Sequence, residues 1–144
     1  RGFTPQDFGV FHPGGKLGAR LKLVRDIMHI GERLPVVGLE ARMDEAIGEI
    51  GRKGFGAVIV VNPDGTLAGI VTDGDLRRHL TPDLMTLPVT AIMTKTPRTI
   101  APDALVASAL EMEEASRITA LIVVENSRPV GLVHYLDLLR AGAA

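Results

Sequence analysis

The sequence predicts an α+β fold in which two copies of a β-α-β-β-α unit pack sheet against sheet around a pseudo-twofold axis. Three observations lead to this expectation: short motifs recur at a nearly constant spacing, each copy carries a helical hydrophobic pattern, and each copy carries β-branched segments too short for helices. One copy of about sixty residues buries too little surface to be more than marginally stable. We therefore expect the two copies to form one cooperative body.

Four pairs of matching segments carry the repeat. They are DIMH at 26–29 with AIMT at 91–94, AVIVV at 57–61 with ALIVV at 120–124, GIV at 69–71 with GLV at 131–133, and DL at 75–76 with DL at 137–138. The first 20 residues are rich in glycine and show no sustained period. We expect a linker or the remnant of a preceding domain at residues 1–20, the first repeat at 21–84 and the second at 85–144.

The first copy begins with a short extended segment at residues 35–37 and continues with an amphipathic helix. The helix is predicted from four apolar residues at i, i+3, i+4 and i+7, which fall on one face. These residues are Met43, Ala46, Ile47 and Ile50.

Two strands and a second helix follow in the first copy. The run at 57–61 predicts a buried strand, and the NPDG sequence at 62–65 predicts a turn, because proline fits its second position and glycine tolerates positive φ. A return strand is expected at 67–71, and a helix is expected to begin within residues 72–78.

The second copy keeps this order with one difference. Val106, Ala109 and Leu110 repeat the helical spacing, but Glu113 stands where the pattern calls for an apolar residue. We therefore expect the second amphipathic helix to be shorter or more exposed than the first. The run at 121–124 predicts the buried strand of this copy.

Composition excludes several classes of function. With 16 Lys+Arg against 17 Asp+Glu and 3% aromatic residues, the chain lacks the basic surface and the stacking platforms of nucleic-acid binding proteins. The absence of cysteine excludes disulfides and thiolate metal sites, and the histidine spacing matches no metal-ligand pattern. No apolar run is long enough for a membrane span, and no signal-peptide pattern is visible. We expect a cytoplasmic protein without a metal, nucleic-acid or membrane partner.

The tandem unit, opened by the DIM sequence at 26–28 and closed by GIVTDGDL at 69–76, resembles a pair of cystathionine-β-synthase (CBS) domains, the regulatory Bateman module. A narrower resemblance, to the C-terminal half of D-arabinose-5-phosphate isomerases, is carried by HPGGKLG at 12–18 together with these motifs and with His134 and residues 137–142. Enzymes of that family place a sugar-isomerase domain before a CBS pair and supply Kdo, the acidic sugar of Gram-negative lipopolysaccharide.

Thr72 and Asp75 form a T-x-x-D motif at a strand-to-helix junction, and it has two interpretations. The structural one is a helix cap, in which the Thr72 hydroxyl accepts a backbone N–H and Asp75 lies near the positive helix end. The functional one uses the same geometry to bind a ligand, because helix-start N–H groups suit a phosphate and a carboxylate accepts both ribose hydroxyls. The resemblance to CBS modules favours the second interpretation.

The second copy has His134 where Thr72 stands in the first, and it keeps Asp137 in place of Asp75. A histidine at this place is a surface or core residue in most proteins, but it could also donate to a phosphate or a sugar carboxylate. This position is therefore either a second site or the far wall of the first. Arg77 and Arg78 follow the first motif closely enough for one of them to neutralise a ligand phosphate.

The resemblance implies a ligand site between the repeats and no active site in this chain. His12 matches a histidine of the isomerase active site, but its lysine and glutamate partners belong to the absent domain, so we predict no catalytic residue here and no enzymatic activity. The predicted ligand-binding residues are Val37, Gly56, Ala57, Gly69, Thr72, Asp73, Asp75, Arg78, Thr119, His134 and Asp137.

The function expected from this resemblance is ligand sensing within an arabinose-5-phosphate isomerase. The candidate ligand is an adenine or cytidine nucleotide such as AMP or ATP, or the nucleotide-sugar CMP-Kdo, and no cofactor is required. The expected partners are a small anionic metabolite, the N-terminal sugar-isomerase domain and further copies of the chain in a homodimer or tetramer. The alternative is a purely structural module that holds isomerase domains together.

Overall fold

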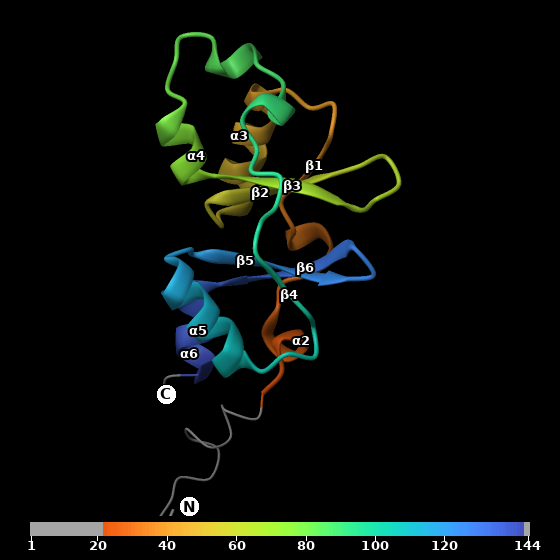
Figure 1. The fold of residues 1–144 in the computed structure, drawn as a ribbon, viewed down its shortest axis with the longest axis vertical. Helices are drawn as coiled ribbons and strands as arrows, with labels where there is room; N and C mark the ends of the chain where they lie inside the picture. Colours follow the sequence, from red (N-terminus) through yellow and green to blue (C-terminus); the bar gives the residue numbers. More distant parts are fainter. Residues whose placement is uncertain (1–21, 143–144) are drawn as a thin grey trace, which may run out of the picture.

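The computed structural model describes residues 22–142, which form two α+β halves stacked along the long axis of the molecule (Figure 1). No helix among these residues has the length and apolar character needed to cross a bilayer. Short helical segments precede each sheet: α2 (Val24–Ile27) and η1 (Gly31–Arg33) before the first, and η2 (Leu84–Thr86) and η3 (Val89–Ala91) before the second.

The first half is a three-stranded sheet with helices attached in the predicted β-α-β-β-α order. β1 (Val36–Gly38) pairs in parallel with β2 (Ala57–Val61), and β2 pairs antiparallel with β3 (Leu67–Thr72). α3 (Met43–Lys53) connects β1 to β2, as a parallel pair requires a crossover. α4 (Asp73–Arg78) begins directly after β3.

The second half repeats this arrangement element for element, which confirms the predicted repeat. β4 (Thr99–Ile100) pairs in parallel with β5 (Ala120–Glu125), and β5 pairs antiparallel with β6 (Arg128–His134). α5 (Val106–Ser116) makes the crossover, and α6 (Tyr135–Gly142) follows β6 directly.

The sequence patterns of the first half have the predicted structural consequences. Met43, Ala46 and Ile50 are buried and form the apolar face of α3 against the first sheet. The Gly65 N–H donates to the Asn62 carbonyl at 2.8 Å, and Gly65 has a φ of +89°, so the predicted turn is present with glycine at its left-handed position.

The two sheets face each other across a shared apolar layer. Ile59 and Ile70 of the first sheet pack against Ile122 and Leu132 of the second, and all four side chains are buried. The α3 helix covers the outer face of the first sheet, and α5 and α6 cover the outer face of the second (Figure 1). Each sheet therefore has apolar contacts on both faces, as its continuous apolar sequence predicts.

The segment before the first sheet packs on the second half. α2 lies with the second sheet and its helices, far from α3 (Figure 1). The Val24 N–H donates to the Ala104 carbonyl at 2.8 Å, and His29 exchanges two backbone hydrogen bonds with Leu132 at 2.9 and 3.1 Å. The chain then crosses to the first half.

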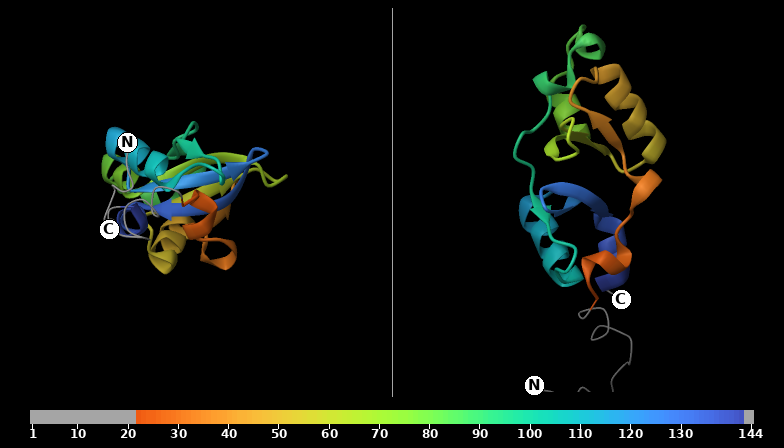
Figure 2. Two further views of the ribbon diagram at one scale, coloured as in Figure 1. Left: turned by 90° about the horizontal axis from the view of Figure 1, so that it is seen from below. Right: turned by 90° about the vertical axis from the view of Figure 1, so that its right-hand side faces the viewer.

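The segment before the second sheet makes the reciprocal contacts with the first half. The Val89 N–H donates to the Ala41 carbonyl at 2.9 Å, and Thr94 exchanges two backbone hydrogen bonds with Ile70 at 2.8 and 3.0 Å. The right-hand view of Figure 2 shows the two crossing segments on opposite sides of the molecule. This exchange joins the halves into one body.

Glycine is required where each crossing segment lies against a strand. A Cβ on Gly69 would lie 2.6 Å from the Thr94 carbonyl oxygen and 2.9 Å from Met93 Sδ, closer than carbon atoms approach either group. Gly131, the equivalent residue of β6, would collide with Met28 in the same way. In each half, the repeated glycine therefore leaves room for the methionine of the repeated isoleucine-methionine pair.

The second amphipathic helix is not shorter than the first, although more of its residues are exposed, and the residue that breaks its pattern is buried. α5 has 11 residues, the same number as α3, and Glu113 is buried with 1% of its surface exposed. No hydrogen-bond partner for the Glu113 carboxyl lies among the described residues. Burial, together with the nearby Asp137 carboxylate, raises its pKa to about 8, so the group is protonated at neutral pH. Glu113 therefore interrupts the apolar pattern of the sequence, but its side chain still packs in the interior.

Replacing Gly69 with alanine should destabilise the protein by about 1–3 kcal/mol, because the new methyl group would displace the segment that contains Met93 and Thr94 from β3. Urea unfolding measures this change. The matched control is Gly51→Ala on α3, where a Cβ meets nothing within 4 Å, and it should be neutral or stabilising by up to about 1 kcal/mol. Equal effects of the two substitutions would contradict the close contact.

Glu113 should make stability fall as pH rises. Its folded pKa of about 8 exceeds its ordinary value of 4.5, so between these values the unfolded chain releases a proton that the folded chain retains. Stability from this group falls by about 1.4 kcal/mol per pH unit across that window. Glu113→Gln should remove this slope and be more stabilising at pH 7.5 than at pH 5. The exposed Glu111→Gln is the control, and an unchanged slope in Glu113→Gln would refute the assignment.

Candidate functional site

A cavity of about 650 Å³ lies where the two halves meet beside α4. Four segments form its walls: the end of β3 with the start of α4, the crossing segment at 94–98, the connection from α5 to β5 at 116–120, and the start of β2 at 56–57. The first wall comes from the first half, and the third comes from the second half. The cavity exists only because the halves are held together.

Seven of the predicted ligand-binding residues meet at this cavity, and four do not. Those that line it are Gly56, Ala57, Thr72, Asp73, Asp75, Arg78 and Thr119. Val37 packs instead against the core under α3, and Gly69 packs against the crossing segment. His134 and Asp137 lie at the equivalent place in the second half. His12, together with residues 1–20, falls outside the described residues.

The T-x-x-D motif forms a capping box at the start of α4. The Thr72 hydroxyl accepts the Asp75 N–H at 3.2 Å, and the Asp75 carboxylate accepts the Thr72 N–H at 3.0 Å. The structural interpretation of the motif is therefore confirmed. Because both groups also line the cavity, the cap does not exclude a role in binding.

The Asp75 carboxylate is buried, with 6% of the side chain exposed, and each of its oxygens is hydrogen-bonded. Oδ2 accepts the N–H and, at 3.2 Å, the hydroxyl of Thr72. Oδ1 accepts Arg78 Nη2 at 2.6 Å and the Thr94 hydroxyl at 3.4 Å. Thr94 belongs to the crossing segment, so this carboxylate links α4 to the wall opposite.

The cavity lining is rich in positively charged side chains. Four arginines and two aspartates line it: Arg77, Arg78, Arg98, Arg117, Asp73 and Asp75. The arginines come from three segments, α4, the crossing segment and the end of α5. This excess of positive charge in a chain whose net charge is −1 favours an anionic ligand.

The remaining wall is apolar and lacks a stacking surface. Ile70, Ala57 and Ile118 contribute aliphatic side chains, and no aromatic residue occurs among the described residues of the lining. A flat ring could be enclosed here between aliphatic groups, while its polar substituents contact the α4 and arginine side.

Sequence reasoning predicted Thr119 from the second half but missed other lining residues that lie far from α4 in the sequence. Thr94, Arg98 and Arg117 line the cavity but were not predicted. One signal was available for Thr94, because it occupies the last position of the AIMT segment that repeats DIMH. The two arginines lie in connections without a matching pattern.

The equivalent position in the second half is occupied by the protein's own side chains. His29, the counterpart of Thr94, places Nε2 2.7 Å from Asp137 Oδ2. The buried ring of Phe55 lies 4.7 Å from the His29 ring and 6.4 Å from the His134 ring, measured between centroids. Arg33 lies over the same Phe55 ring at 5.5 Å. The two halves therefore share a backbone plan but offer different sites.

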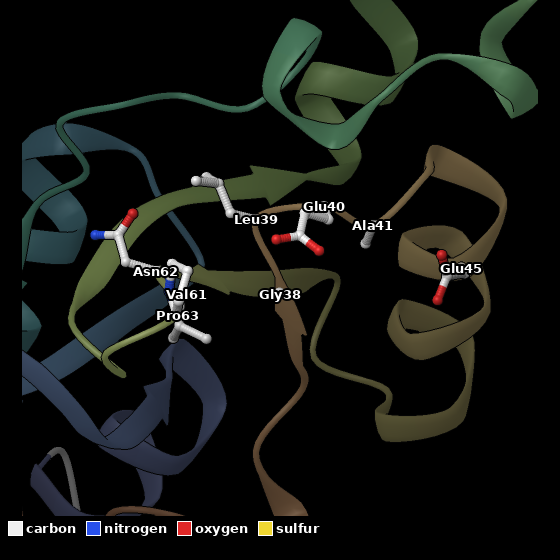
Figure 3. A pocket seen from close by; sticks show the side chains of 8 residues that line it. All are labelled: Gly38, Leu39, Glu40, Ala41, Glu45, Val61, Asn62 and Pro63. Carbon is white, nitrogen blue, oxygen red and sulfur yellow. The ribbon is translucent and has the colours of Figure 1, made fainter.

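A second depression of about 470 Å³ lies in the first half, where β1 and β2 end (Figure 3). It is lined by the residues after β1, the start of α3 and the turn after β2. Its charged lining residues are Glu40 and Glu45, with no cation beside them in the lining. The cavity beside α4 is therefore the better candidate for an anionic ligand.

Comparison with known families identifies the repeat. The CBS domain family matches residues 24–82 and again 89–144. Arabinose 5-phosphate isomerase KdsD of Pseudomonas aeruginosa is 47% identical over 146 residues, which cover 99% of this chain. The match covers 45% of that relative, so the chain spans about half the length of the curated relative, in its C-terminal part.

Solved structures share the fold. The CBS domain pair of protein MJ0100, in complex with 5-methylthioadenosine and S-adenosyl-L-methionine, has a TM-score of 0.72 and 25% identity and covers 83% of this chain and 94% of its own. CBSX2 in complex with AMP has a TM-score of 0.72 at 22% identity and covers 84% of this chain and 96% of its own.

Proposed function

This chain belongs to the CBS-domain family, and from that premise we propose that it is a regulatory module whose inter-repeat cavity binds a nucleotide or a nucleotide-sugar. CBS domains are regulatory, and the CBS pair is the non-catalytic part of the isomerase relatives. The predicted absence of enzymatic activity in this chain agrees with that assignment.

The observation that carries the proposal is the composition of the cavity beside α4. It places a buried carboxylate, Asp75, next to several arginines and an aliphatic wall. A nucleotide has matching groups: a ribose diol that donates to a carboxylate, a phosphate that pairs with arginine, and a flat base. Asp75 is proposed to bind the ribose, and Arg78, Arg98 and Arg117 the phosphate side.

The ligand class is supported by related structures. The related MJ0100 and CBSX2 structures are complexes with adenosine-containing ligands, which supports AMP or ATP as candidates here. The isomerase relative supports a second candidate, CMP-Kdo, because an end product of the pathway would give the module a feedback signal. CMP-Kdo also carries a ribose that could bind the Asp75 carboxylate, and a phosphate and a sugar carboxylate that could bind the arginines.

The parent protein is proposed to be an arabinose-5-phosphate isomerase that acts in the cytoplasm in Kdo and lipopolysaccharide biosynthesis. The matched relative is about twice as long as this chain, which leaves length for a preceding sugar-isomerase domain. Residues 1–20 are proposed to link that domain to a first repeat at 21–84 and a second at 85–144. The full protein is proposed to be a homodimer or tetramer.

A structural role without a ligand is the second candidate. It is favoured by the capping box, which already gives Thr72 and Asp75 a role in stabilising α4. Exposed apolar side chains such as Leu80 and Met85, at 73% and 47% exposure, offer surface for contact with another domain or chain. On this account, substitutions at the motif would lower stability without changing any response to nucleotides.

Binding should appear as thermal stabilisation by one or more of AMP, ATP, CMP and CMP-Kdo. A ligand at 100 times its Kd adds about 2.7 kcal/mol, which raises Tm by about 5–10 °C in a chain of this size. Asp75→Asn should abolish the shift, because the amide has only one acceptor oxygen for the two ribose hydroxyls and places a donor where the second oxygen was.

Glu45→Gln is the matched control. Glu45 is the third residue of α3 and accepts the Arg42 N–H at 3.2 Å, as Asp75 does at α4, but it lies outside the cavity. Its substitution should lower stability by at most about 1 kcal/mol and leave the ligand shift intact. The absence of a shift with every ligand in the wild-type protein would reject the sensing function and favour the structural role.

A further inference from the structure

The Asp75 carboxylate has no free acceptor site in the structure. A carboxylate offers about four lone-pair sites, and four donor contacts from Thr72, Arg78 and Thr94 already occupy the two oxygens. A ribose diol that donates two hydrogen bonds to Asp75 must therefore displace existing donors. Which donor leaves determines what the ligand must supply in exchange.

Arg78 is the donor that can leave. The Thr72 N–H is backbone at the end of β3 and is fixed by the sheet, whereas the Arg78 side chain is 66% exposed and lies on the cavity side. The Thr94 hydroxyl is held only by a long contact of 3.4 Å and can rotate in place. Breaking the Arg78 bond leaves both Thr72 contacts and the capping box intact.

Gly74 leaves room for the Arg78 side chain in the position where it binds Asp75, which we call its closed position. The Arg78 guanidinium folds back over the first turn of α4, and a Cβ on Gly74 would lie 3.3 Å from its Nη1. With glycine there, the side chain can pivot between Asp75 and the cavity without a neighbouring side chain in its path.

The second half has no comparable arrangement. The counterpart of Arg78 is Arg140, whose Nη1 lies 3.6 Å from Asp137 Oδ1, and the other Asp137 oxygen is held by His29 at 2.7 Å. Of these two aspartates, only Asp75 is bound at short distance by a single exposed arginine that also lines an open cavity.

We propose that Arg78 is a latch that selects nucleotides over nucleosides, an inference that rests on the proposed function of the cavity. In the free protein Arg78 covers Asp75. A ligand diol takes its place on the carboxylate, and the released guanidinium pairs with the phosphate of the same ligand. A nucleoside supplies the diol but no anion, so it displaces Arg78 without giving the arginine a new partner.

The test compares AMP with adenosine, and CMP with cytidine as a second pair, by titration calorimetry on the wild-type chain and on Arg78→Gln. In the variant, nucleotide affinity should fall at least tenfold, while nucleoside affinity should stay constant or rise, because a competitor of the diol is gone. Arg77→Gln is the matched control, with the same loss of charge in the cavity lining but no ion pair with Asp75 in the described structure. It should lower nucleotide affinity less and leave nucleoside affinity unchanged.

The outcomes separate the latch from the function on which it rests. If wild-type protein binds nucleotides but Arg78→Gln weakens nucleotide and nucleoside equally, or changes neither, the latch is wrong and the sensing function remains. If neither nucleotide binds the wild-type protein, AMP and CMP recognition fails and the latch fails with it. Circular dichroism of Arg78→Gln confirms that the variant is folded. Gly74→Ala crowds the position in which Arg78 binds Asp75 but keeps the cation. Nucleoside affinity should therefore rise in this second variant, while nucleotide affinity, unlike that of Arg78→Gln, should not fall.

Discussion

The structure depends on a backbone exchange between its halves. Thr94 pairs with Ile70, and His29 pairs with Leu132, so the segment that leads into each sheet is hydrogen-bonded to a strand of the other sheet. The close approach requires Gly69 and Gly131, and the facing sheets then bury one apolar layer. Neither half retains its full set of backbone partners alone, because each lends a segment to the other. The cavity follows from this constraint, since one of its walls is such a crossing segment.

The same exchange creates two related positions, and side chains make them different. At the first, Thr94 reaches Asp75 only by a long hydroxyl contact, and the space opposite is bordered by Ile118. At the second, His29 binds Asp137 directly and the Phe55 ring packs beside it. A duplicated backbone thus offers an open cation-rich cavity on one side and a position occupied by its own imidazole and phenyl rings on the other. We therefore propose that the first position, and not the second, holds the ligand.

Much of the fold was predictable, because it follows from the local hydrophobic periodicity of the sequence and from its internal repeat. The helix beginning at Met43, the strands and the turn at Gly65 follow from short patterns. Glu113 misled the prediction because a periodic pattern treats a carboxyl group as exposed, while burial in protonated form satisfies the packing. The site was predictable only in part. Thr72 and Asp75 form a local motif, whereas Arg98 and Arg117 reach the cavity through contacts between the halves, which no local pattern encodes.

We propose that one ligand binds per chain, at the cavity beside α4. Titration calorimetry with AMP measures the number of sites directly. On this proposal, binding saturates at one equivalent per chain, with the same stoichiometry and affinity in Asp137→Asn, because Asp137 is engaged by His29 away from the cavity. Two equivalents in the wild-type protein, or a loss of binding in Asp137→Asn, would contradict it by showing that the second half carries a working site.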